Sequence, residues 1–325
     1  MLGSNIDDIL KNQLDKTLNE THFSSLGKLY RGKVRDNYIR NDIRIIIATD
    51  RLSAFDRVIT TIPFKGQMLN QVSSFWFDKT KHIAKNHIID VPDPNVAIVH
   101  QCDLIPVEMI IRAYITGTAW RNYLKNIPTS GIILPKGLKK NQRLENLMIT
   151  PSTKAKSGHD IYLSKNEVIK KNLVNKNIYE EMENVAVQLF KFGQKFCEKN
   201  GLILVDTKYE FGLKDDELYV IDEIHTQDSS RFWILDTYQE HFQKGLEPEI
   251  LDKEIFRGWL METYPAIFPN IKPDQEIPPI SSAIKIELAK RYMKSYLKIT
   301  GEKFKPEVAN VEERIIKNLK NHNFI

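Results

Sequence analysis

Polar and apolar residues alternate along a segment near residue 208. From position 206 to position 210 every second residue is charged (Asp206, Lys208 and Glu210), whereas Val205, Tyr209 and Phe211, at the alternate positions, are apolar. Successive side chains of a β-strand point to opposite faces. The pattern therefore predicts a strand with one buried face and one charged face.

A second apolar run follows after a short polar stretch. The residues Lys214 to Asp216 read as a turn, and the sequence ELYVIDEIH resumes the strand pattern, so the two runs predict a hairpin. An odd number of loop residues would place Asp222 on the face of Asp206 and Glu210. A loop of two or four residues would place Asp222 on the opposite face, unless a bulge intervenes.

The rest of the chain predicts a β-rich beginning and a helical end. Apolar spacing and turn residues give the following elements, in chain order: strands on both sides of a tight turn at Gly32, a buried strand Arg44–Asp50, a helix Gly66–Thr80, an apolar strand Ile105–Thr116, a short helix after Gly117, a helix Ile178–Asn200 capped by Gly201, and helices Ala283–Leu297 and Val308–Leu319. Between Pro128 and Asp160 no period is visible, which predicts a long excursion over the surface.

Composition narrows the class of protein only moderately. The chain has 325 residues, 42% of them hydrophobic, which is enough for a sizeable core. The net charge of +5 is spread over the whole length, and no basic block with interleaved aromatic residues indicates a nucleic-acid groove. Cys102 and Cys197 lack metal-ligand spacing, so a reducing cytoplasm is expected. The acidic N-terminal segment predicts no signal peptide, and no apolar run is long enough to span a membrane.

The charged strand face has two interpretations. It is either the solvated side of an amphipathic edge strand or a phosphate–magnesium site. In the second case Glu210 and Asp222 would hold the hard cation and Lys208 would face a transferring phosphoryl group. The segment TQDSSR beyond the hairpin adds an acceptor, a hydroxyl and a bidentate guanidinium donor (Asp228, Ser230 and Arg231). Together these residues favour a nucleotide enzyme over a binding module.

Two earlier motifs are ambiguous. In YRGKVRD, a glycine turn followed by Lys33 and Arg35 could approach phosphates closely, but taken alone the motif favours a plain hairpin turn at Gly32. In ATDRLSAFD, polar residues follow a buried strand, where loops commonly carry ligand contacts. These polar residues are Asp50, Ser53 and Asp56. The alternative is that Asp50 or Ser53 caps the N-terminus of a helix.

An arginine inside an apolar strand is more informative. Arg112 interrupts the run VEMIIRAYIT, and a buried guanidinium needs an anionic partner, either a ligand or a neighbouring carboxylate. Thr118 begins the next helix, where a hydroxyl and local N–H groups could bind phosphate. The lone histidines His159 and His225 are interpreted as structural. No nucleophile motif is present, so covalent catalysis by a side chain is not expected.

Seven motifs together resemble one family. YRGKVRD, ATDRLSAFD, IPFKGQMLNQ, VEMIIRAYITGT, TPSTKA with GHD, LVDTKYEFG, and IDE with DSSRFW occur in the order found in SAICAR synthetases (phosphoribosylaminoimidazole-succinocarboxamide synthases). The resemblance spans about residues 28–236, and the TPSTKA segment is similar to the longer form of the family. Single motifs of this kind are unspecific, but seven in order are specific.

The resemblance implies a fold and a reaction. The fold would be α+β, with a β-rich nucleotide-binding lobe over residues 1–110, a larger α+β catalytic lobe over 111–250, C-terminal helices over 251–325, and ATP in a cleft between the lobes. The enzyme would be an ATP-dependent ligase of de novo purine biosynthesis. It would join CAIR, the carboxylated aminoimidazole ribotide, to L-aspartate and give SAICAR, ADP and phosphate through an acyl phosphate.

The resemblance also implies roles for single residues. Mg²⁺ would be held by Glu210 and Asp222, and the catalytic residues would be Lys208, which faces the developing charge, and Asp206, which orients it or takes a proton from the amine. The nucleotide would be bound by Gly32, Lys33, Arg35, and the strand segment Glu108 to Ile110. The other substrates would be bound by Arg112, Thr118, Asp228, Ser230, Arg231, Ser53, Asp56 and Lys154, with Ser157 closing over them. The family often has serine where Thr118 stands, and the hydroxyl is kept.

The expected partners are small molecules, namely ATP, CAIR and L-aspartate, with no nucleic acid, no membrane and a monomeric protein. Two rival functions use some of the same features. A kinase acting on a small-molecule hydroxyl would need the same lysine and Mg²⁺. A basic nucleic-acid-binding module would show a steep salt dependence, but carboxylate pairs would repel a phosphate backbone.

Overall fold

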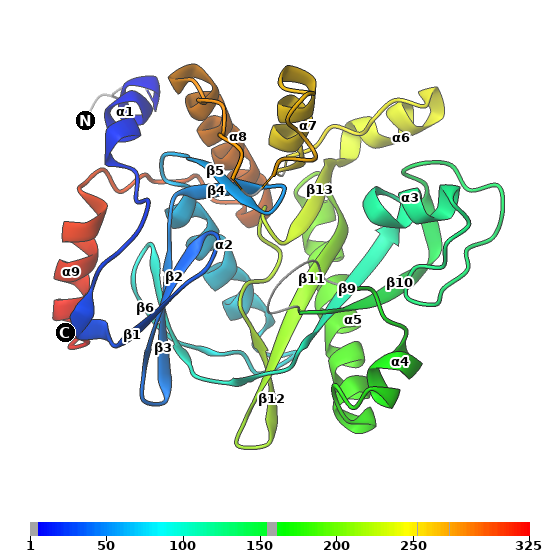
Figure 1. Cartoon of the computed structure of the whole chain (residues 1–325), viewed down its shortest axis with the longest axis horizontal. Helices are drawn as coiled ribbons and strands as arrows, with labels where there is room; N and C mark the ends of the chain where they lie inside the picture. Colours follow the sequence, from blue (N-terminus) through cyan, green and yellow to red (C-terminus); the bar gives the residue numbers. More distant parts are fainter. Residues whose placement is uncertain (1–5, 155–160, 252, 273) are drawn as a thin grey trace. The chain divides into compact units, whose positions relative to one another are not determined.

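The computed structural model describes residues 6–154, 161–251, 253–272 and 274–325. The chain forms two compact units (Figure 1). Unit 1 contains residues 1–75, 88–101 and 251–325, and unit 2 contains residues 76–87 and 102–250. The segment after residue 250, predicted as a separate helical segment, therefore belongs to the same unit as the N-terminal strands. The three predicted domain ranges stay a prediction.

Unit 1 contains a five-stranded antiparallel sheet. Its strands, in spatial order, are β1 (Lys28–Arg31), β2 (Arg35–Arg40), β3 (Ile43–Ala48), β7 (Val96–His100) and β6 (Ile88–Asp93). A separate two-stranded ribbon is formed by β4 (Arg51–Ala54) and β5 (Arg57–Thr61). The predicted turn at Gly32 and the buried strand after it are confirmed.

Alternation along β3 and β7 divides the apolar residues of unit 1 between the two faces of the sheet. Ile45 and Ile47 join one buried cluster together with residues of helix α9 (Val311–Asn321). Ile46, between them, joins a second cluster with Ala97 and Val99. The run of three isoleucines is thus buried on both sides, which explains why it shows no polar positions.

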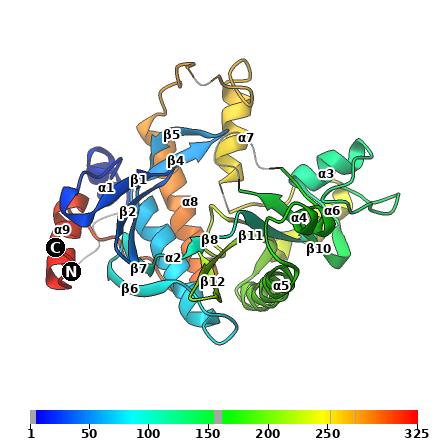
Figure 2. The ribbon, with the colours of Figure 1, turned by 60° about the horizontal axis from the view of Figure 1, so that its bottom comes forward.

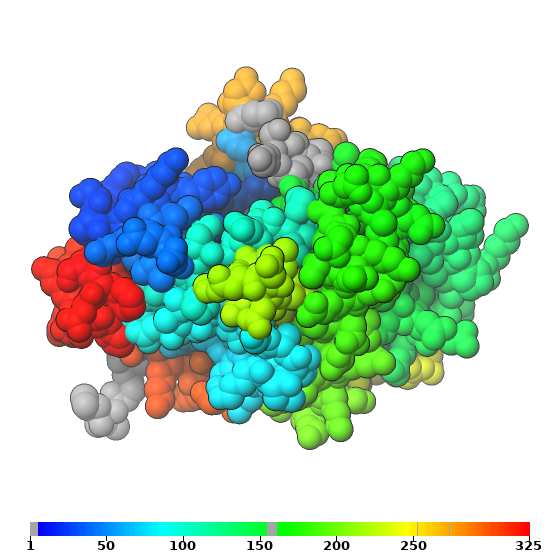
Figure 3. Space-filling view, turned by 90° about the horizontal axis from the view of Figure 1, so that it is seen from below, coloured from blue at the N-terminus to red at the C-terminus, as the bar shows by residue number. Residues whose placement is uncertain are grey.

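Helices complete unit 1. They are α1 (Ile6–Gln13), α7 (Glu254–Thr263), α8 (Ser282–Thr300) and α9, together with the short turns Leu14–Lys16 and Ser24–Leu26. Helix α2 (Lys65–Thr80) begins in unit 1 and ends in unit 2. Arg40 of β2 donates a hydrogen bond of 3.0 Å to the carbonyl of Phe324, which lies near the C-terminal end of the chain. Figure 3 shows the C-terminal residues in red beside blue N-terminal residues.

Unit 2 is built around the long strand β11. The sheet order is β10 (Arg143–Thr153), β9 (Val107–Tyr114), β11 (Leu202–Lys214) and β12 (Glu217–Ile221), and β11 also pairs with β8 (Asp103–Leu104) and β13 (Ser230–Ile234). The helices of this unit are α3 (Gly117–Leu124), α4 (Lys165–Lys170), α5 (Lys176–Lys199) and α6 (Leu235–Lys244). Helix α5 packs on β9 and β11, and Figure 2 views it nearly along its axis.

One prediction about unit 2 is wrong. The segment 128–160 is not an irregular excursion throughout, because it contains strand β10, which pairs antiparallel with β9. Strand β10 lies at the edge of the sheet and its register is interrupted between Arg143 and Met148. An edge strand tolerates a proline such as Pro151 and a largely polar sequence. These properties hid the strand pattern.

The remaining predicted helices and strands of the two units are confirmed to within a few residues. Helix α5 ends at Lys199, and Gly201 adopts a φ of +71°, as expected after a helix C-terminus. No helix in the described ranges is both long enough and apolar enough to cross a membrane.

Candidate active site

Strand β11 presents a charged face whose centre is Lys208. Tyr209 and Phe211 are completely buried on the other face, as the alternation predicted. The Lys208 ammonium donates to Glu210 on the same strand and, at 3.2 Å, to Glu108 on the neighbouring strand β9. Asp222 lies 4.0 Å from the same nitrogen. Three carboxylates from three segments thus converge on one lysine.

Asp222 reaches this cluster in a way that the hairpin rule did not anticipate. Lys214 pairs with Glu217, so the loop has two residues, both with positive φ, rather than the three expected. Continued pairing would place Asp222 on the face opposite Glu210. However, β12 ends at Ile221 and Asp222 adopts a φ of +66°. Leaving the ladder in this way brings its carboxylate to the ammonium that Glu210 also contacts.

Electrostatics keep Lys208 charged. Burial disfavours the ammonium, but the carboxylates of Glu108, Asp222 and Glu223 outweigh it, so the pKa of Lys208 is raised. A second ammonium, Lys154, forms an ion pair with the other oxygen of Glu210. Three carboxylates therefore face two ammonium groups, a balance that still favours an additional cation.

The donor set of this cluster suits magnesium by its chemistry. Glu210 and Asp222 offer hard carboxylate oxygens, which Mg²⁺ prefers and normally supplements with water and phosphate oxygens. Within the described ranges, no three acidic, histidine or cysteine side chains form a complete metal cage. Two protein ligands with room for phosphate oxygens is the usual arrangement for a nucleotide-bound Mg²⁺.

Asp206 occupies the same strand but has different neighbours. Its Oδ2 accepts from Arg112 of β9 at 2.9 Å and from Arg231 of β13 at 2.8 Å, because both arginines pair with Asp206 in the strand register. Asp206 therefore positions two guanidinium groups. Its predicted action on Lys208 or on the substrate amine stays a prediction.

Arg112 is held on three sides. In addition to Asp206, it donates to the Thr150 hydroxyl at 3.1 Å and to the Tyr162 hydroxyl at 3.0 Å. The alternative of a salt bridge to a neighbouring carboxylate is thus the observed one. Thr150 begins the TPSTKA motif but was given no role from the sequence, and Tyr162 was not singled out.

Arg231 lies against the beginning of helix α3. Gly117 has a φ of +55°, and a Cβ added there would come within 2.4 Å of the Arg231 guanidinium. Thr118 accepts from Arg121 at 2.7 Å, and Ser230 donates to Thr207 at 2.6 Å. The structure thus brings Arg231 to the helix that carries Thr118. Asp228, two residues before Ser230, is half-buried.

The predicted phosphate turn lies in unit 1. The Gly32 N–H donates to the Arg35 carbonyl at 2.8 Å, and Lys33 forms an ion pair with Asp56. Arg51, which sequence reasoning missed, donates to the carbonyls of Gly32 and Lys33 at 3.0 and 2.9 Å. Its planar guanidinium fixes the turn, a role that no spacing in the sequence reveals.

Other candidates have structural partners or fall outside the description. Ser53 lies within β4 and does not begin a helix. Asp50 accepts from the N–H groups of Leu18 and Gly66, and burial raises its pKa to about 6. Ile110 lies in β9 opposite Lys208, and its carbonyl accepts from Thr150. Ser157 and His159 lie outside the described residues.

Behind the charged face, a buried pair joins β11 to the segment that carries Asp222. The Tyr209 hydroxyl oxygen lies 2.6 Å from Nε2 of His225, and both side chains are completely buried. The His225 ring also meets Trp76 edge-on at 4.7 Å between centroids. Burial lowers the pKa of His225 to about 3. The interpretation of His225 as structural agrees with this environment.

This histidine should make folding stability depend on pH. In the unfolded chain His225 has a pKa near 6.5 and binds a proton below that pH, whereas in the folded chain it stays neutral down to about pH 3. The free energy of unfolding therefore falls as the pH is lowered from 6.5 to about 3. The loss approaches about 1.4 kcal/mol for each pH unit. Urea unfolding of the wild type and of His225→Asn across this range measures it. The free energies of unfolding of the two proteins should converge as the pH falls, and parallel pH dependences would contradict the assignment. The raised pKa of Asp50 has the opposite effect on stability, but it is present in both proteins and does not change the comparison.

Comparisons with known proteins identify the family of the chain. Residues 28–270 match the SAICAR synthetase family. The chain is 44% identical to the phosphoribosylaminoimidazole-succinocarboxamide synthase of Bacteroides thetaiotaomicron, over 94% of this chain and 98% of that protein. It is 43% identical to the chloroplastic enzyme of Arabidopsis thaliana, over 98% of this chain and 78% of that protein.

Solved structures give the same answer. The SAICAR synthase of Saccharomyces cerevisiae, determined in complex with SAICAR, superposes with a TM-score of 0.77 at 30% identity and covers 89% of this chain and 99% of that one. The α+β fold predicted from the motifs is therefore confirmed. From its sequence and its fold, the chain belongs to the SAICAR synthetase family.

Proposed function

We propose that this chain joins CAIR to L-aspartate with ATP, giving SAICAR, ADP and phosphate in purine biosynthesis, and that the reaction passes through an acyl phosphate. Membership of the SAICAR synthetase family supports the overall reaction. The observation that supports the mechanism is the charged face of β11. There Lys208 stands among Glu108, Glu210 and Asp222, while Asp206 holds two arginines.

The chemistry explains why an activated intermediate is needed. A carboxylate is a poor acyl donor, because resonance stabilises it and oxide is an impossible leaving group. Transfer of the γ-phosphoryl group to the CAIR carboxylate gives an acyl phosphate, and ADP leaves. The aspartate amine then attacks the acyl carbon, phosphate leaves, and the amine gives up a proton. Lys208 would stabilise the charge that develops on the transferring group.

Glu210 and Asp222 would hold Mg²⁺, which would neutralise phosphate charge during the transfer. Their convergence on one ammonium supports this pairing. Gly32, Lys33 and Arg35 would cover the phosphates, and the backbone from Glu108 to Ile110 would meet adenine. The turn that Arg51 fixes supports the first of these roles.

The CAIR phosphate and ribose would be bound by the residues around Asp206. Arg231 and Arg112 supply guanidinium groups, and Thr118 and Ser230 supply hydroxyls. Because its side chain is 23% exposed, against 4% for Arg112, Arg231 is the better candidate for direct contact. Asp228, Ser53, Asp56 and Lys154 complete the proposed substrate contacts. We also propose a monomer in the cytoplasm, a location with which two free, buried cysteines are consistent.

A coupled assay tests the reaction directly. Purified protein with ATP, CAIR and L-aspartate should release ADP and form the succinocarboxamide in equal amounts, and omission of any one substrate should stop amide formation. ATP consumption with phosphorylation of a hydroxyl, without an amide, would instead identify a small-molecule kinase.

The metal assignment predicts a change in magnesium dependence. Glu210→Gln and Asp222→Asn should each reduce kcat by about 10²-fold or more and raise the Mg²⁺ concentration needed for half-maximal rate, since each removes a charged ligand. Titration of the rate with Mg²⁺ at saturating substrates measures both effects. Glu217→Gln, an exposed carboxylate at the start of β12, is the matched control. Normal rates and normal Mg²⁺ dependence in the first two variants would refute the assignment.

A further inference from the structure

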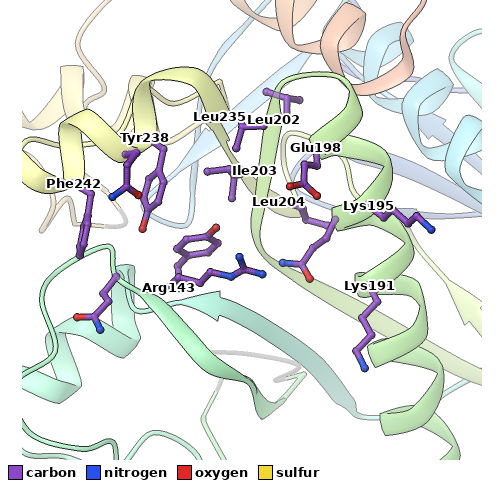
Figure 4. Close-up of a pocket in the computed structure, with 14 residues that line it drawn as sticks. Arg143, Lys191, Lys195, Glu198, Leu202, Ile203, Leu204, Leu235, Tyr238 and Phe242 are labelled. Atoms are coloured by element: carbon purple, nitrogen blue, oxygen red, sulfur yellow. The ribbon is translucent and has the colours of Figure 1, made fainter.

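Unit 2 contains a pocket of about 550 Å³ that the proposed reaction does not use. It lies between helices α5 and α6, the beginning of β11 and the beginning of β10 (Figure 4). None of the site residues assigned above is among the described residues that line it. Its volume is within the range of small-molecule sites, which is about 300–1,000 Å³.

Opposite charges enter this pocket from two walls. Figure 4 shows the Arg143 guanidinium reaching inward from β10 and the Glu198 carboxylate pointing inward from α5. Both act on the buried Tyr114: burial raises the pKa of its phenol, with Arg143 opposing the shift and Glu198 adding to it. Both residues are exposed, and within the part of the chain that the structure describes neither charged side chain has a hydrogen-bond or ion-pair partner.

Without a bound cation, the carboxylate of Glu198 interacts unfavourably with the end of helix α5. It stands in the last turn of α5, which ends at Lys199, and the C-terminal end of a helix carries partial negative charge. A carboxylate there, without a protein cation, is repelled by the helix. A bound ammonium group would be attracted by both the carboxylate and the helix terminus.

The rest of the lining combines aromatic and aliphatic side chains with neutral amides and two lysines. The Tyr238 ring meets the Tyr114 ring edge-on at 5.4 Å and stacks with Phe242 at 5.9 Å. Leu202 and Leu204 of β11 contribute aliphatic surface. Lys191 and Lys195 also border the pocket, but Figure 4 shows their side chains extending away from it. Gln142, Gln194 and Gln239 add neutral hydrogen-bonding groups to the lining, so the charged groups directed inward are one cation and one anion beside an aromatic wall.

We propose that this pocket binds a small zwitterion with an aromatic body, of which an aromatic α-amino acid is the simplest form. Its carboxylate pairs with Arg143 through two parallel hydrogen bonds. Its ammonium pairs with Glu198 at the end of α5, and its ring packs on Tyr238 and Phe242. This site is separate from the proposed reaction and does not depend on it.

Three matched probes test the proposal on the full-length protein by calorimetry. L-Phenylalanine has both charges, 3-phenylpropionate has only the carboxylate, and 2-phenylethylamine has only the ammonium. Saturating L-aspartate is present throughout, so that binding at the reaction's own amino-acid site is excluded. L-Phenylalanine should bind most tightly, and each single-charge probe about tenfold or more weakly.

Two variants assign the charges. Arg143→Gln should weaken L-phenylalanine and 3-phenylpropionate by about tenfold or more but leave 2-phenylethylamine unchanged, and Glu198→Gln should do the reverse. Lys176→Gln, an exposed lysine at the opposite end of the same helix, should leave all three affinities unchanged. Equal binding of L-phenylalanine and 3-phenylpropionate, or no binding of L-phenylalanine up to its solubility, would overturn the proposal. The coupled assay on the same samples shows whether each variant is folded.

Discussion

Lys208→Met is expected to lower kcat of the ligase reaction by about 10²- to 10³-fold, the range measured when one charge-stabilising donor is removed from an active site. Methionine keeps the unbranched shape and most of the length of the side chain but removes the charge that three carboxylates surround. The KM for CAIR should change much less, because Lys208 is proposed to act on the transferring phosphoryl group. Steady-state kinetics with saturating Mg²⁺ separate the two effects.

The same strand offers a matched control. Lys214→Met changes the same side chain at the hairpin end of β11, where Lys214 pairs with Asp215, and should leave kcat within about twofold of the wild type. Removing Lys208 also takes one cation away from the buried carboxylates of Glu108 and Glu210, so urea unfolding must accompany the kinetics. A folded Lys208→Met protein with normal kcat would exclude the proposed role.

Arg231→Ala is expected to weaken CAIR binding by about 30-fold or more, while ATP binding changes little. Truncating one partner of a hydrogen-bonded charge pair typically costs about 2 kcal/mol or more, which corresponds to this factor. Arg231 pairs with Asp206 at 2.8 Å and is the more exposed of the two arginines. Separate titrations with CAIR and with ATP measure the two affinities.

A second variant tests the same site without removing a charge. Gly117→Ala places a methyl group where the Arg231 guanidinium lies, at a residue whose φ of +55° disfavours alanine. It should weaken CAIR binding in the same direction as Arg231→Ala. Arg291→Ala, an exposed arginine of α8, serves as the control. If both site variants bind CAIR normally, or lose ATP affinity equally, Arg231 does not bind CAIR.

Much of the charged strand could be predicted, because alternation is a local property. The period of two predicts that Tyr209 and Phe211 are buried on one face of the strand. It also predicts that Lys208 lies on the opposite, charged face. The position of Asp222 could not be predicted, because it depends on one backbone dihedral after the last paired residue of β12. Loop parity alone, applied to the observed two-residue turn, would have placed this carboxylate on the wrong face.

Contacts between distant strands were also beyond reach of the sequence. Arg112 was predicted to need an anion, but the choice of Asp206 depends on the register between β9 and β11. Glu108 was expected to contribute only backbone, although its side chain meets Lys208. Strand β10 was missed because edge position and interrupted register removed the usual pattern.

The anchoring of the glycine turn by Arg51 bears on how natural variation in this chain should be judged. One flat side chain satisfies carbonyls at Asn19, Gly32 and Lys33 and the carboxylate of Asp36. A lysine carries the same charge but only a single nitrogen, which cannot address four acceptors in one plane. Arg51→Lys, a conservative substitution by charge and size, would therefore destabilise the glycine turn strongly.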